Sequence, residues 1–128
     1  MASSSLSPAD RRERIRQYKD AFPPMGVFAL RNLANGRVYV GASTNVEGAI
    51  NRMRFELQRR GHRNAALMAD WLAFGPDRFR FEVLDRVRPS TDPAFDPQAE
   101  LEAMTELWRE ELDGYMPAGY NPRGGSAA

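Results

Sequence analysis

The 128-residue chain contains no cysteine, one lysine and one histidine. The absence of cysteine excludes disulfide bonds, thiolate zinc sites and a cysteine nucleophile. Because His62 is the only histidine, a metal site with two histidine ligands is excluded as well. No apolar run approaches the roughly 20 residues of a membrane-spanning helix, and the N-terminus lacks the apolar stretch of a signal peptide. We therefore expect a cytoplasmic protein with no membrane partner.

The remaining composition is that of an ordinary globular domain. A chain of this length fits one domain of about 100–200 residues and can bury roughly two thirds of its unfolded surface. Hydrophobic residues make up 42% of the chain and charged residues 27%. One hydrophobic core is therefore expected.

The net charge of +1 hides an asymmetry along the chain. Residues 1–88 hold 16 basic and 9 acidic side chains, whereas residues 89–128 hold 2 basic and 8 acidic ones. Opposite charges on two segments are compatible with head-to-tail pairing in a homodimer. Of the 18 basic residues only Lys19 is a lysine. The arginines are suited to phosphate contacts, but composition alone favours the simpler explanation, a GC-rich genome that encodes arginine wherever a positive surface is needed.

Periodicity and turn residues predict the order helix, hairpin, two helices, strand, helix. Ser7-Pro8-Ala9-Asp10 has the form of a helix start, and the basic helix that follows extends to about Asp20. Two runs rich in β-formers flank an Asn-Gly turn, which is a strong hairpin signal. The predicted strands are 27–32, 37–41 and 79–84, and the later helices begin near 46, 64 and 97. The fold class is α/β (α+β), a small three-stranded sheet flanked by helices.

The predicted organisation is one domain with two short extensions. Residues 1–22 form an N-terminal tail and the basic helix, residues 23–122 form the domain, and residues 123–128 form a flexible tail.

Two strand motifs one hairpin apart resemble those of the GIY-YIG nuclease family. Gly26-Val27-Phe28 is similar to the first motif, and Val38-Tyr39-Val40-Gly41 is similar to the second. The resemblance continues through the helix–helix–strand segment to a closing turn at Gly119-Tyr120-Asn121. The stretches 25–30 and 51–57 look most like a bacterial branch that is sometimes grouped with LuxR-type regulators.

The resemblance implies a phosphodiester-cleaving site from which most of the chemistry is missing. Family members use strand tyrosines, a helix arginine, a histidine or tyrosine one turn later, and a metal-binding glutamate on the last helix. Tyr39 matches the second tyrosine and Gly41 its motif. The positions of the first tyrosine, arginine, histidine and glutamate hold, in order, Phe28, Ala49, Met53 and Thr105.

Two residues lie close enough in sequence to act as substitutes. Arg52 follows Ala49 by three residues and is a candidate catalytic cation with Tyr39. Glu102 precedes Thr105 by about one helical turn and is a candidate ligand for Mg²⁺ or Mn²⁺, if the protein is active.

A cluster of basic residues at the end of the first domain helix is a candidate nucleic-acid contact. Its members are Arg54, Arg59, Arg60, His62 and Arg63. Three hypotheses follow from the sequence: a GIY-YIG-fold protein that binds DNA or RNA with little or no standard cleavage, an active endonuclease with a rearranged site, and a protein-interaction module.

Overall fold

The computed structural model describes residues 7–12 and 24–123. Residues 8–12 are helical, and the Ser7 hydroxyl accepts a hydrogen bond from the Asp10 N–H at 3.1 Å, as the predicted helix start requires. The predicted N-terminal tail before Ser7, the rest of the basic helix and nearly all of the flexible tail lie outside the described residues. In the parts of the chain that are described, no helix has the length and apolar character to cross a membrane.

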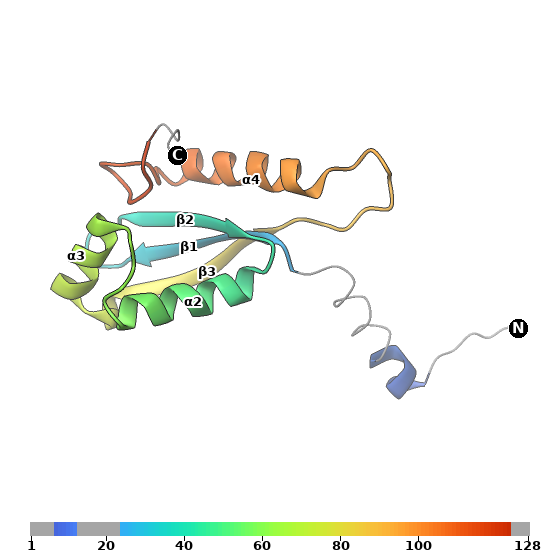
Figure 1. The fold of residues 1–128 in the computed structure, drawn as a ribbon, viewed down its shortest axis with the longest axis horizontal. Helices are drawn as coiled ribbons and strands as arrows, with labels where there is room; N and C mark the ends of the chain where they lie inside the picture. The colour runs from blue at the N-terminus through green and yellow to red at the C-terminus, as the bar shows by residue number, and fades with distance from the viewer. Residues whose placement is uncertain (1–6, 13–23, 124–128) are drawn as a thin grey trace, which may run out of the picture.

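Three antiparallel strands form the sheet, in the order β2-β1-β3 (Figure 1). The strands are β1 (Gly26–Asn32), β2 (Val38–Ser43) and β3 (Phe79–Arg86), close to the predicted ranges. The β1–β2 hairpin turns at Gly36, whose φ of 82° is readily adopted by glycine. The predicted α+β fold and its hairpin are thus confirmed.

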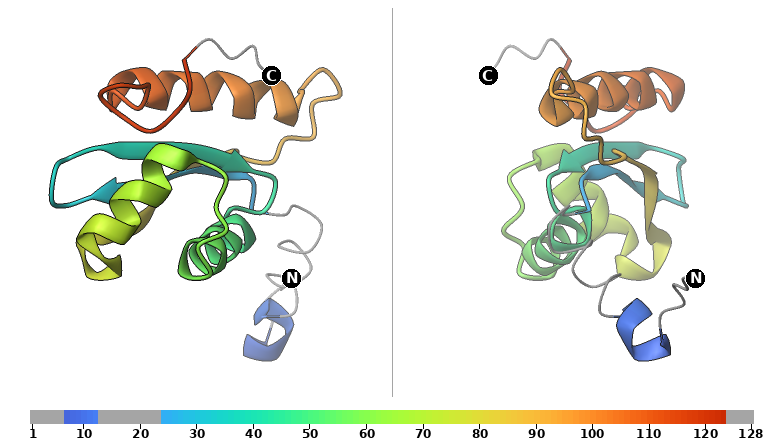
Figure 2. Two further views of the ribbon diagram at one scale, coloured as in Figure 1. Left: turned by 60° about the vertical axis from the view of Figure 1, so that its left-hand side comes forward. Right: turned by 90° about the vertical axis from the view of Figure 1, so that its right-hand side faces the viewer.

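Helices cover both faces of the sheet (Figures 1 and 2). Helix α2 (Val46–Gln58) and helix α3 (Ala65–Phe74) lie on one face, and α4 (Pro97–Glu111) lies on the other. A short 3₁₀ turn, η1 (Pro76–Arg78), leads from α3 into β3. Helices α2, α3 and α4 each begin at a side-chain cap, supplied by Asn45, Asn64 and Asp96.

Alternate residues of β1 supply two separate cores, because successive side chains of a strand point to opposite faces. Phe28 and Leu30 pack with α2 and α3, whereas Val27 and Ala29 pack with Leu101 of α4. Since β1 is the central strand and both its faces are buried, it is apolar almost throughout.

The closing turn of the chain pairs with the free edge of β2. The Asn121 side chain accepts a hydrogen bond from the Val40 N–H at 2.9 Å and donates one to the Val40 carbonyl at 2.8 Å. The Tyr120 N–H donates to the Val38 carbonyl at 3.0 Å. These bonds satisfy edge groups that would otherwise lack partners and hold the turn after α4 against the sheet.

A polar network surrounds the buried ring of Tyr120. Its hydroxyl accepts a hydrogen bond from Asn32 at 3.0 Å and donates one to Asp70 at 2.7 Å. The Arg37 guanidinium lies 4.4 Å from the ring centroid and also binds Asp70. Burial is the main reason that the pKa of Tyr120 rises to about 12, so the hydroxyl keeps its proton and remains a donor. The network joins the hairpin, α3 and the closing turn.

We expect Tyr120→Phe to lower the free energy of unfolding by about 1–3 kcal/mol, because it leaves the buried Asn32 amide without its acceptor. Urea unfolding monitored by circular dichroism measures the change. Tyr115→Phe is the matched control, since the Tyr115 hydroxyl faces solvent and binds the exposed Glu106. Equal stability of the two variants would contradict a structural role for the Tyr120 network.

Candidate functional site

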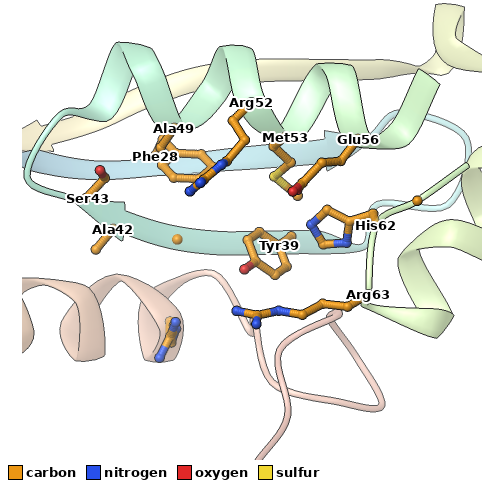
Figure 3. A pocket seen from close by; sticks show the side chains of 13 residues that line it. Phe28, Tyr39, Ala42, Ser43, Ala49, Arg52, Met53, Glu56, His62 and Arg63 are labelled. Atoms are coloured by element: carbon orange, nitrogen blue, oxygen red, sulfur yellow. The ribbon is translucent and has the colours of Figure 1, made fainter. Parts of the chain in front are cut away.

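A cavity of about 610 Å³ opens between β2, α2, the connection from α2 to α3, and α4. Figure 3 shows most of the side chains that line it. Tyr39 comes from β2, Arg52 and Glu56 come from α2, and His62 and Arg63 come from the connection. Arg109 of α4 also lines it. Three consecutive segments of the chain and the distant helix α4 therefore meet at one cavity.

An aromatic pair and one glycine form the wall on the sheet side. The rings of Phe28 and Tyr39 lie 6.4 Å apart between centroids. A Cβ atom at Gly41 would lie 2.7 Å from the Phe28 ring and 3.1 Å from the Tyr39 ring, closer than the packed rings permit. Gly41 is thus required because the two rings pack across its backbone.

Three arginines from three different segments face the cavity. In Figure 3, Arg52 extends from α2 and Arg63 from the connection to α3, with Tyr39 between them in the view. The Arg109 guanidinium donates to the Val40 carbonyl through Nε at 3.3 Å and Nη2 at 3.2 Å, which orients it at the edge of β2. Among the described residues, Glu56 is the one carboxylate that lines the same cavity. The cavity is therefore positively charged.

His62 is held as a neutral ring at the cavity wall. Its Nδ1 accepts the Asn64 N–H at 3.1 Å, and its ring meets the Tyr39 ring edge to face at 6.0 Å. Burial lowers the pKa of His62 below its ordinary value, Arg63 lowers it further, and Glu56 opposes them. Since Nδ1 accepts, the proton of the neutral ring lies on Nε2.

The predicted metal ligand lies in a neighbouring cavity. Glu102 lines a space of about 510 Å³ with Thr105 and Glu106. This space borders the first cavity, because Ala42, Ser43 and Arg109 line both. Glu102 and Tyr39 therefore lie in adjoining spaces rather than in one shared cavity.

The side chains around Glu102 do not fit a divalent cation. The buried Thr105 hydroxyl donates to the Leu101 carbonyl at 2.6 Å, and Glu106 accepts a hydrogen bond from Tyr115. Arg109 places a positive charge against both spaces, which disfavours a second cation there. Across residues 7–12 and 24–123, no three acidic or histidine side chains are grouped as a metal site would need.

The other predicted residues divide between the cavity and its surroundings. Met53 is buried in the core and Ala49 is partly buried, and both also line the cavity floor. Arg54 points at Phe81, with its guanidinium carbon 4.8 Å from the ring centroid, and so belongs to the sheet side of α2. Arg59 lies over Phe55, and Arg60 is exposed at the end of α2. The predicted basic cluster is thus divided: His62 and Arg63 line the cavity, whereas Arg54, Arg59 and Arg60 do not.

Arg109 and Glu56 are cavity residues that sequence reasoning missed. Arg109 follows Thr105 by four residues, so the two lie on the same face of α4. The resemblance places the metal-binding glutamate at Thr105, so a residue on the same helix face as Thr105 is itself a candidate for the site. Glu56 follows Arg52 by the same interval on α2 and could have been found in the same way.

Comparison with solved structures identifies the fold. The catalytic domain of the intron endonuclease I-TevI, solved as a mutant, is 21% identical in sequence, with a TM-score of 0.63 over 77% of this chain and 92% of that one. A second structure of the catalytic domain of homing endonuclease I-TevI is 23% identical, with a TM-score of 0.64 over 78% and 99%. No protein-family model and no curated protein matches the sequence. The chain therefore has the fold of the GIY-YIG catalytic domain, as its two strand motifs predict.

Proposed function

We propose that the chain binds the phosphate backbone of DNA or RNA in the cavity between α2, β2 and α4, with little or no metal-dependent cleavage. One observation carries this proposal. Arg52, Arg63 and Arg109 reach the same cavity from three separate segments, and within the described part of the chain Glu56 is the one carboxylate that lines this cavity with them. An accessible cavity with this charge balance attracts anions.

Arginine is suited to this role because its planar guanidinium matches the oxygens of a phosphate. Arg109 is oriented before any ligand arrives, since two of its donors are bound to the Val40 carbonyl. A side chain that is already ordered loses less conformational entropy on binding. Arg52 and Arg63 are exposed and can adjust to the ligand.

Cleavage is not supported by the side chains at the positions that the resemblance assigns to chemistry. Phe28, Ala49 and Met53 carry no group that transfers a proton or stabilises developing charge. The Thr105 hydroxyl is buried and bonded within its own helix. Loss of one member of a catalytic set can lower a rate by orders of magnitude, and here four are replaced.

A rearranged endonuclease is the second candidate, because Tyr39 and Arg52 share the cavity as that hypothesis requires. Its proposed metal ligand, Glu102, lies in the adjoining space beside Arg109. The first candidate needs no metal ion and is preferred for that reason.

We expect Arg52→Ala and Arg63→Ala each to weaken binding of a labelled oligonucleotide about tenfold at low salt, because each removes one charged contact with phosphate. Each variant should also lower the slope of log affinity against log salt by about 1. Fluorescence anisotropy with DNA and RNA probes measures both. Arg88→Ala, which removes an exposed arginine away from the cavity lining, is the control and should differ little from wild type. Failure of the wild-type protein to bind any probe would refute the proposal.

Binding should strengthen as the pH is lowered from about 7.5 to about 5, the range in which histidines titrate. His62 is neutral at the higher pH because burial holds its pKa below the usual range, and protonation adds a positive charge inside the cavity. In His62→Asn, which keeps an acceptor for the Asn64 N–H, the increase should be smaller. Anisotropy titrations across this range measure the difference between the two proteins. Superimposable pH profiles would rule out His62 as a contact.

We expect no cleavage of plasmid or oligonucleotides in Mg²⁺ or Mn²⁺, and no loss of binding when EDTA replaces the metal, because divalent cations only compete for the phosphates. Gel electrophoresis after prolonged incubation tests the first and anisotropy tests the second. Cleavage that disappears in the double variant Arg52→Ala, Glu102→Ala would establish the rearranged endonuclease instead.

A further inference from the structure

The proposed phosphate cavity continues along α2 into a second space of about 420 Å³. Arg52, Glu56 and Gly61 line both spaces, and the second adds Phe55 and Arg59. The two spaces are therefore adjoining parts of one surface. An aromatic ring and a further arginine therefore lie beside Arg52 of the first cavity.

Phe55 contributes little to the core. Its side chain is 55% exposed, whereas Val46, Met53 and Leu57 of the same helix are buried. A single exposed apolar residue needs no special explanation. Phe55 differs from an isolated exposed apolar residue because basic side chains lie on both sides of it along the helix. Arg52 precedes it by three residues and Arg59 follows it by four, so all three share one face of α2.

Arg59 lies against the Phe55 ring, with its guanidinium carbon 5.1 Å from the ring centroid. This contact restrains the ring while leaving it more than half exposed. A restrained and accessible aromatic ring beside arginines is the combination with which proteins bind unpaired nucleotides, since the ring stacks on a base and the arginines contact phosphates.

We propose that Phe55 is a stacking platform for one unpaired base, and that the chain therefore prefers single-stranded nucleic acid to duplex. This rests on the proposed binding of phosphate in the adjoining cavity. Residues three apart on a helix have Cβ atoms about 5–6 Å apart, so a base on Phe55 and a phosphate at Arg52 can belong to the same short stretch of strand. In a duplex the faces of each base are covered by its neighbours, and stacking on Phe55 would first require a base to leave the helix.

The charge around Phe55 favours a nucleotide over an apolar protein segment as the occupant. Arg52 and Arg59 flank the ring, and of the described residues Glu56 is the one acid lining this space. Among the described residues Phe55 is the one apolar side chain that lines this space, which is too little for the apolar core of a protein interface. Unpaired nucleic acid supplies both a flat apolar face and negative charge.

Phe55→Ala should weaken binding of a labelled single strand of about 15 nucleotides about 5- to 150-fold at low salt, the loss expected for one stacked base. Phe55→Trp should retain the affinity, because it keeps an aromatic face. Affinity for a duplex of the same sequence should change less than about twofold in both variants, since stacked bases offer the ring no free face. A strand of equal length and charge that lacks bases should bind wild type and Phe55→Ala equally.

Phe74→Ala is the matched control, since Phe74 is 43% exposed at the end of α3 and is absent from the lining of both spaces. It should bind single strands as wild type does. Circular dichroism and urea midpoints verify that the variants remain folded. The inference is overturned if Phe55→Ala binds single strands like wild type, if its loss is the same for the strand without bases, or if wild type prefers duplex. Absence of binding to every probe would instead refute the proposed function itself.

Discussion

The arrangement of the site depends on the backbone N–H and carbonyl of Val40, which lie on the free edge of β2. An edge strand exposes N–H and carbonyl groups that need partners. The Asn121 side chain binds both groups of Val40, and Arg109 binds the same carbonyl. One residue thereby holds the closing turn, orients a cation from α4 and borders Gly41, where the cavity begins. If this edge were bonded to another strand, neither Asn121 nor Arg109 could occupy its present place.

The side chains of the cavity have to be considered separately from the fold, because a fold by itself does not specify a chemistry. The architecture matches the catalytic domain of I-TevI over 77–78% of the chain. Around the cavity, however, positive charge comes from arginine side chains, and Glu102 and Glu106 of α4 lie in the adjoining space. A guanidinium stabilises bound negative charge but cannot activate a water molecule as a metal ion does. This difference is the reason that the proposed function is binding of phosphate without cleavage.

Helix α2 serves both the core and the proposed interface. Val46, Met53 and Leu57 bury one stripe against the sheet, while Arg52, Phe55 and Arg59 stay exposed along another. Because the buried stripe fixes the rotation of the helix, it also fixes where the exposed stripe points. Arg54 falls between the two and is directed at Phe81 on β3, away from the cavity.

The sequence by itself determined the order of the elements, the hairpin at Asn35-Gly36, the helix start at Ser7 and the GIY-YIG fold. These depend on local spacing, turn chemistry and short motifs, which neighbouring residues encode. It also placed Tyr39, Arg52, His62 and Arg63 among the candidates. Only the tertiary structure brought Arg109 to them and directed Arg54 elsewhere. The contact of Arg109 with Val40 joins residues 69 positions apart. Such a contact depends on how α4 packs across the sheet, and no local pattern in the chain specifies that packing.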